Sequence, residues 1–150
     1  MRYRHRFRVR APLADVVEFH SRADSMAAIT PPIIPVQMEP APPQLASGSQ
    51  MAFTMWLGPL PVKWRAFISQ LSSQGFSDHQ IEGPFRYWIH QHTFVNVDEQ
   101  HTKVIDEVQA GLKWHAVWAP AGLAMWLGLP LLFAYRGWKT RRTLESANKS

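Results

Sequence analysis

Two histidines and one aspartate have the types and spacing that suit acid–base chemistry. His90 and His92 are two positions apart, and side chains at that spacing in a β-strand lie on the same face. Asp106 lies in the next predicted strand, so we expect it near the histidines. An imidazole with a pKa near neutrality, oriented by a carboxylate, suits proton transfer. His90, His92 and Asp106 are therefore the candidate catalytic residues.

Two other interpretations of these residues stay open. Both histidines could be hydrogen-bonded structural groups in a half-polar cavity, because structural networks also shift the pKa of ionisable groups. This structural role is the one that we favour. Two histidines with a carboxylate also form a metal-ligand set, but the seven histidines are scattered among the predicted strands, so chance pairs are expected. We therefore expect no bound metal and no other cofactor.

The strand that carries the histidines is predicted to extend from Phe85 to Phe94, after a Gly-Pro turn. Alternation along this strand gives one face with Trp88, His90, His92 and Phe94, and a second face with Phe85, Tyr87, Ile89 and Thr93. Large apolar groups on both faces predict that neither face is solvated. Two histidines between two aromatic residues favour the wall of a cavity over a dry core.

The remaining elements indicate an α+β protein. Residues 2–10 alternate between arginine and apolar or aromatic residues, which predicts a half-buried strand with its arginines in solvent. Two short helices are expected next, one after Pro12 and one over residues 24–29. Further strands are expected at residues 36–39, 50–55, 62–69, 76–82 and 102–110. A C-terminal helix would begin near Pro130 and bury a stripe of Leu131, Ala134, Tyr135 and Trp138. The order predicts an antiparallel sheet of six to seven strands that curls over one long helix.

Charge and composition exclude several classes of protein. The net charge is +5, and the five arginines between positions 2 and 10 account for it, because the other 11 basic residues balance 11 acidic ones. Such local basicity does not indicate a nucleic-acid-binding protein. The absence of cysteine excludes disulfides and thiolate metal sites. The arginine-rich N-terminus lacks the apolar stretch of a secretory signal, so we expect a cytoplasmic protein.

The segment from Leu112 to Leu132 is apolar and rich in tryptophan. Polar residues, a proline and a glycine interrupt it, and its unbroken part is shorter than the roughly 18–20 residues of a membrane-spanning helix. Apolar segments of this kind often mark an interface. A lid or a membrane-touching patch would use Trp114, Trp118, Met125, Trp126 and Leu127, with the three tryptophans as the expected transient membrane contact. Packing against the open end of the sheet and a dimer contact stay open as alternatives.

Several short motifs occur in a specific order along the chain. They are Ala11-Pro12 followed by residues 16–19, then Gly83-Pro84-Phe85 with Trp88, His90, His92 and Phe94, then Asp106-Glu107-Val108, and finally Phe133-Ala134-Tyr135-Arg136. Together they resemble the SRPBCC superfamily, also called START-like or birch-pollen-allergen-like, which includes the polyketide cyclase/dehydrase group. The resemblance covers residues 2–145. One departure is Gly137, where close relatives often have a histidine or arginine after the Tyr-Arg pair.

The resemblance implies a single domain over residues 1–150 with a helix-grip fold, a deep apolar cavity, and the histidines on the central strand. The tail at residues 146–150 is expected to be frayed. The implied partner is a hydrophobic small molecule such as a lipid, quinone, polyketide or sterol. Its expected binding residues are Phe53, Trp64, Trp88, His90, His92, Phe94, Asp106 and Phe133. A non-enzymatic binding protein is preferred, and the alternatives are a cyclase/dehydratase-type enzyme and a membrane-surface lipid-binding protein.

Overall fold

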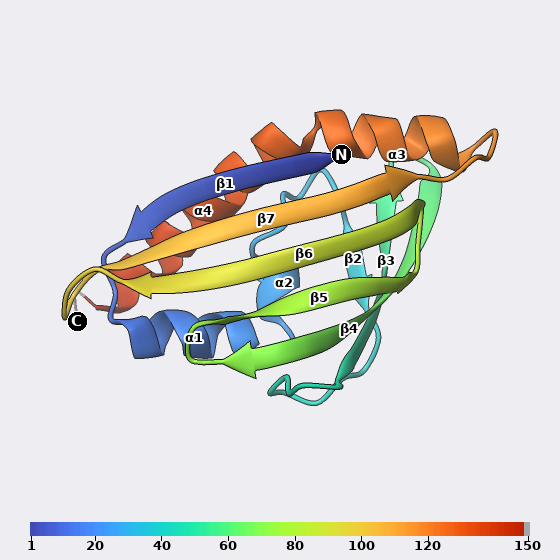
Figure 1. The fold of residues 1–150 in the computed structure, drawn as a ribbon. Helices are drawn as coiled ribbons and strands as arrows, with labels where there is room; N and C mark the ends of the chain where they lie inside the picture. The colour runs from blue at the N-terminus through green and yellow to red at the C-terminus, as the bar shows by residue number, and fades with distance from the viewer. Residues whose placement is uncertain (149–150) are drawn as a thin grey trace.

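A single seven-stranded antiparallel sheet forms the body of the protein, as the computed structural model of residues 1–148 shows (Figure 1). The strand order is β1-β7-β6-β5-β4-β3-β2. The strands are β1 (Arg2–Val9), β2 (Val36–Met38), β3 (Gln50–Leu57), β4 (Leu60–Ser72), β5 (Gly75–Glu82), β6 (Phe85–Asn96) and β7 (Thr102–Leu112). The helices are α1 (Leu13–Ser21), α2 (Ser25–Ala28), α3 (Trp118–Leu127) and α4 (Leu129–Ala147).

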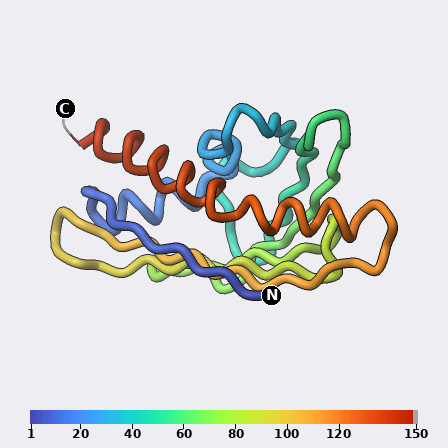
Figure 2. The backbone as a smooth tube through the Cα atoms, turned by 90° about the horizontal axis from the view of Figure 1, so that it is seen from above, coloured from blue at the N-terminus to red at the C-terminus, as the bar shows by residue number. Residues whose placement is uncertain are grey.

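The long helix α4 lies along one side of the curved sheet (Figure 2). Helix α1 packs against β6 on the same side and buries Val16 and Phe19 there. The core between this side of the sheet and the helices forms two adjoining clusters, one centred on α1 and one on the first half of α4. The predicted α+β fold, with two short helices after the first strand and one long C-terminal helix, is confirmed.

Strand β1 shows how the sequence pattern sets the geometry. Its arginines are exposed, while Phe7 and Val9 are buried, as the alternation predicts. The strand pairs with β7 in a register that places His5 opposite Asp106. Pro12 then precedes α1 as its N-cap residue, so the chain turns from the sheet edge into the helix.

Strand β6 corrects three predictions from the sequence. A register shift between Phe85 and Tyr87 interrupts strict alternation, so Phe85 is buried with Trp88 instead of lying on the opposite face. The outer face is partly solvated, because no helix of the described residues covers it, and Tyr87 is 40% exposed. The strand order also makes β5 the central strand, because β1 pairs with β7 and moves β6 towards one edge.

The C-terminal region corrects the predicted apolar stripe. Helix α4 buries Leu129, Phe133, Gly137, Thr140 and Leu144. The predicted stripe lies on other faces of α4, where Leu131 is 79% and Trp138 is 48% exposed. The reason is that the buried face is built partly from small residues: an added Cβ at Gly137 would lie 3.3 Å from His5 and Phe7 side-chain atoms, so β1 and α4 approach closely there.

Helix α3 is an element that the sequence pattern did not identify as a helix. Its ten residues form the middle of the tryptophan-rich segment, and only Gly122 is fully buried. In the described part of the chain no single helix is long and apolar enough to cross a membrane, whereas α3 and α4 together, bent by 50°, pass that test of length and composition. Helix α4 continues to Ala147 and includes the start of the predicted frayed tail, whose residues 149 and 150 lie outside the described residues.

Candidate functional site

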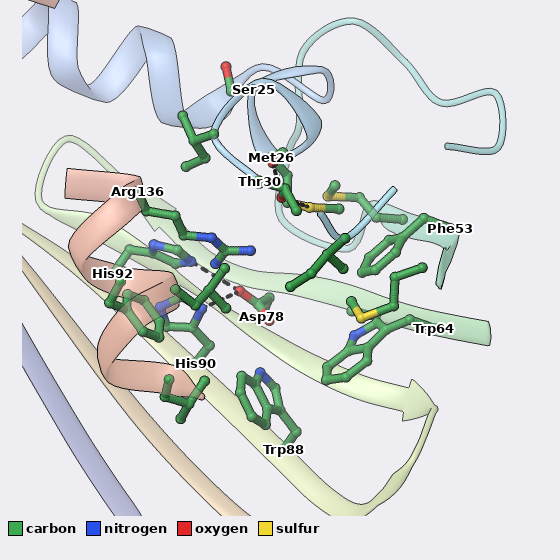
Figure 3. A pocket seen from close by; sticks show the side chains of 18 of the residues that line it. Ser25, Met26, Thr30, Phe53, Trp64, Asp78, Trp88, His90, His92 and Arg136 are labelled. Carbon is green, nitrogen blue, oxygen red and sulfur yellow. Dashed lines mark hydrogen bonds and ion pairs between the residues drawn. The ribbon is translucent and has the colours of Figure 1, made fainter. Parts of the chain in front are cut away.

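A cavity of about 340 Å³ lies between the sheet, α2 and the region where α3 meets α4. Most of its wall is apolar, and one end is polar (Figure 3). The apolar part includes Met26, Ile29, Met51, Phe53, Met55, Trp64, Ile68, Trp88, Met125, Leu129 and Phe133. Cavities of this kind, with an apolar wall and a few convergent polar groups, are typical of small-molecule sites.

Three neighbouring strands bring the polar end together. Cross-strand pairing places His90 opposite Asp78 of β5 and His92 opposite Asp106 of β7. Because His90 and His92 lie on one face of β6, each histidine also reaches the other aspartate diagonally. Two histidines and two aspartates therefore form one compact group, which we call the His–Asp cluster.

Each histidine of the His–Asp cluster contacts both aspartates. His90 Nε2 lies 3.0 Å from Asp106 Oδ1, and His92 Nε2 lies 3.0 Å from Asp78 Oδ2, both as hydrogen bonds. His90 Nδ1 is 3.5 Å from Asp78 Oδ2. His92 Nδ1 is 3.1 Å from Asp106 Oδ1, but without hydrogen-bond alignment, so this contact is electrostatic. Each ring nitrogen thus faces a carboxylate.

The pKa shifts in the cluster separate the two histidines. Burial by itself lowers the pKa of His92, but Asp106 and Asp78 outweigh it and raise the pKa to about 9. Burial and the charge of His92 lower the pKa of His90 despite both aspartates. Burial disfavours both carboxylates, yet the histidines hold the pKa of Asp78 and of Asp106 below the usual range. At neutral pH His92 is therefore the charged histidine.

Two further ionisable side chains face the cavity beside the cluster. Arg136 reaches in from α4, and its buried Nε has no hydrogen-bond partner. Burial lowers the pKa of Arg136, and Asp106 and Asp78 oppose that effect. His20 of α1 bonds through Nδ1 to the Val16 carbonyl oxygen at 2.8 Å. Burial and His92 lower the pKa of His20 to about 4, so it is neutral at pH 7.

The structure places most of the predicted site residues around this cavity. Its wall includes Phe53, Trp64, Trp88, His90, His92 and Phe133. Asp106 lies behind the histidines as their partner and outside the wall. Phe94 also lies outside the wall, because it packs in the core between Phe76 and His20.

Sequence reasoning missed three charged residues of the cavity, Asp78, Arg136 and Arg22. Asp78 lies on a strand that was predicted, but only the register of β5 on β6 places it opposite His90. Arg136 belongs to the Tyr-Arg motif, yet the sequence does not give the phase of α4 that turns its side chain inward. The one signal in the sequence for Asp78 was the alternation of residues 76–82, which places its side chain on one face of a predicted strand.

The same group has the donor set of a metal site. One ligand atom from each of Asp78, His90 and His92 lies within 4.8 Å of the others. Two imidazoles with one carboxylate are ligands that divalent transition metals accept. Asp106 would then hold the second nitrogen of each histidine, as partners of metal-bound histidines commonly do. Without a metal, hydrogen bonds of 3.0 Å already join His90 to Asp106 and His92 to Asp78, while His92 Nδ1 has no hydrogen-bond partner.

No protein-family model and no curated protein matches the sequence. The fold is similar to that of norcoclaurine synthase from Thalictrum flavum, in complex with dopamine and hydroxybenzaldehyde: TM-score 0.67, 13% identity, over 97% of this chain and 87% of that chain. It is also similar to the Zhui aromatase/cyclase from a Streptomyces species, with TM-score 0.69 and 14% identity over 95% of each chain. A nucleoside-diphosphate sugar epimerase from Corynebacterium glutamicum is 26% identical, with TM-score 0.68 over 95% of this chain but 29% of that chain.

Proposed function

We propose that this chain, which has the helix-grip fold of the birch-pollen-allergen-like (SRPBCC) proteins, binds a hydrophobic small molecule in the cavity beneath α4. The observation that carries the proposal is the cavity itself, with an extended apolar wall and polar side chains gathered at one end. Burial of apolar ligand surface there is favourable by about 25 cal/mol per Å² before the costs of ordering.

The polar end supports a ligand that carries an oxygen acceptor. Arg136 lines the cavity, its Nε has no hydrogen-bond partner, and a ligand carbonyl, hydroxyl or carboxylate oxygen would accept a hydrogen bond from its guanidinium. An unmet buried donor is costly, so satisfying it favours such a ligand over a plain hydrocarbon. We propose that Arg136 fixes the polar end of the ligand while Phe53, Trp64 and Trp88 contact its apolar body.

The alternative is a cyclase- or dehydratase-type enzyme that uses His90 or His92 as the base. It requires a histidine and Asp106 within hydrogen-bond reach, and His90 meets that requirement at 3.0 Å. A base must also offer a nitrogen to the substrate. All four ring nitrogens lie within 3.5 Å of a carboxylate oxygen, which favours binding over catalysis.

A displacement titration tests the binding function. N-phenyl-1-naphthylamine, a neutral dye that fluoresces in apolar sites, is bound first and then displaced by decanol or decanoate. We expect both compounds to displace the dye from the wild type. Arg136→Gln should weaken decanoate about tenfold, because a hydrogen bond to a charged group contributes about 1.5–3 kcal/mol.

The matched control is Arg142→Gln, on the same helix but outside the cavity wall. It should leave both affinities unchanged. Failure of decanol and decanoate to displace the dye would contradict the binding function. Equal effects of Arg136→Gln and Arg142→Gln would contradict the proposed role of Arg136 but not the binding function.

A further inference from the structure

The outward side of α3 and of the first half of α4 carries several exposed apolar side chains. Successive residues of this surface are three to seven positions apart in the sequence. No charged residue occurs between positions 116 and 135. We call this surface the α3–α4 face and define it by Val117, Leu123, Leu127, Leu131 and Trp138, with Trp114 just before α3. Trp114 is fully exposed, and Leu127 and Leu131 are 70% and 79% exposed.

Such exposure is unusual for these helices. A helix that is apolar all round is normally buried in a protein core or in a membrane. Helix α3 packs only one side on the sheet, where an added Cβ at Gly122 would meet Leu112 and Phe85 at 3.1 and 3.4 Å. Single exposed apolar residues need no explanation, but a contiguous set marks an interaction surface. The exposed apolar residues therefore indicate that a partner covers this face.

The charges around the face identify the kind of partner. Residues 108–144 contain five basic residues and no acidic residue. Arg136 faces the cavity, and Arg141 donates to the Arg8 carbonyl oxygen, which leaves Lys113, Lys139 and Arg142 as the other cations of this segment. In the sequence they flank the apolar stretch next to Trp114 and Trp138, and the Arg142 guanidinium lies 5.5 Å from the centre of the Trp138 ring. Tryptophan at the ends of an apolar stretch is typical of segments at a membrane–water interface.

A second copy of the chain is a poorer partner for this face. In a symmetric dimer the same patch meets itself, so the cations of one copy would lie against those of the other. An anionic bilayer instead provides apolar depth for the leucines and opposite charge for Lys113, Lys139 and Arg142. The balance of charge thus favours lipid over self-association.

We propose that the α3–α4 face docks on the surface of an anionic lipid bilayer. The proposal refines the contact residues expected from the sequence: Trp118 and Trp126 are half-buried, and Leu131 and Trp138 join the expected Trp114 and Leu127. Docking places the cavity next to the bilayer, because Ala124, Met125 and Leu129 of the same two helices line it. The proposal does not depend on which ligand the cavity holds.

Vesicle flotation tests the proposal. The full chain is mixed with vesicles of phosphatidylcholine alone or of equal parts phosphatidylcholine and phosphatidylglycerol, at low and at high salt. We expect flotation with the anionic vesicles at low salt and much less in the other conditions. The double variant Leu127→Glu/Leu131→Glu should lose at least tenfold in partitioning. Lys139→Gln and Arg142→Gln should each lose about fivefold.

Matched controls place the same changes elsewhere. Ile81→Glu/Val95→Glu adds two acidic groups at exposed apolar positions of the sheet, and Arg2→Gln removes a cation from β1. Both should float like the wild type. Thermal unfolding and dye binding of Leu127→Glu/Leu131→Glu should match the wild type, which separates this proposal from the binding function.

Three results would overturn the proposal. One is the absence of wild-type flotation with anionic vesicles at low salt. Another is equal loss in the test and control variants. The third is a dimer in light scattering that Leu127→Glu/Leu131→Glu dissociates, which would assign the face to a second copy.

Discussion

His92 is the residue on which the charge of the polar end depends. It is 13% exposed in its side chain and lies between Asp78 and Asp106. Those carboxylates raise its pKa from 6.5 to about 9 although burial opposes them. With His92 and Arg136 positive and both aspartates negative, the buried charges balance. A buried ion pair of this kind is costly to break from one side only.

The raised pKa of His92 predicts a pH dependence of stability. A group whose pKa is higher in the folded state stabilises fully below its unfolded pKa and loses that contribution as the pH rises through the folded pKa. The window for His92 is therefore about pH 6.5 to 9. The free energy of unfolding, measured by urea denaturation, should fall by up to about 3 kcal/mol across it.

His92→Gln should remove most of that fall. His101→Gln should keep it, because His101 pairs with Asp98 at the surface, 2.9 Å away. A wild-type stability that stays constant between pH 6.5 and 9 would contradict the charged state of His92. The low pKa values of His20 and His90 act on the acid side of this window and leave it unaffected.

Residue types and a period of two were enough to predict part of the site. They placed His90 and His92 on one face and Asp106 on the neighbouring strand, as the structure confirms. They could not find Asp78, because pairing between β5 and β6 depends on contacts far apart in the sequence. The prediction placed Phe85 on the wrong face because alternation fails at a bulge. No local sequence pattern predicts that bulge.

At the scale of elements, the rotation of α4 about its own axis decides which of its side chains line the cavity. The sequence offers two apolar sides for this helix, and the predicted one, with Leu131 and Trp138, is exposed. The buried side contains Gly137 and Thr140, which let α4 approach the sheet closely. Pattern reasoning chose the wrong side, because it weighs hydrophobicity and does not see the space left by small residues.

A size change on each side of α4 tests this rotation. Gly137→Leu should destabilise by about 1–3 kcal/mol, because its Cβ already lies 3.3 Å from His5 and Phe7 side-chain atoms and a larger side chain must displace them. Ala134→Leu, on the exposed side, should change stability by less than about 0.5 kcal/mol. Urea denaturation of both variants measures the difference. Equal effects, or a larger effect of Ala134→Leu, would contradict the packing of α4.

At the scale of the molecule, the order of the strands and of the other helices was predictable because each of these elements has a clear local signal. Alternating residues marked the strands, and Gly-Pro turns separated them. The curvature that creates a cavity was not visible in these signals, and neither was helix α3. Both depend on how the sheet and helices meet. The strand with His90 and His92 indicated a cavity wall, but the expectation of a deep apolar cavity came from the resemblance to a family.

The central claim is that a hydrophobic ligand enters the cavity, and methionine methyl groups report on it directly. Met26, Met51, Met55 and Met125 line the cavity, whereas Met1 and Met38 lie outside its wall. With methyl-labelled methionine, NMR spectra are recorded as N-phenyl-1-naphthylamine is added. We predict shifted signals and ligand contacts for the four cavity methionines and unchanged signals for Met1 and Met38. Unchanged cavity methionines at saturating dye, or shifts at Met125 alone, would contradict the account.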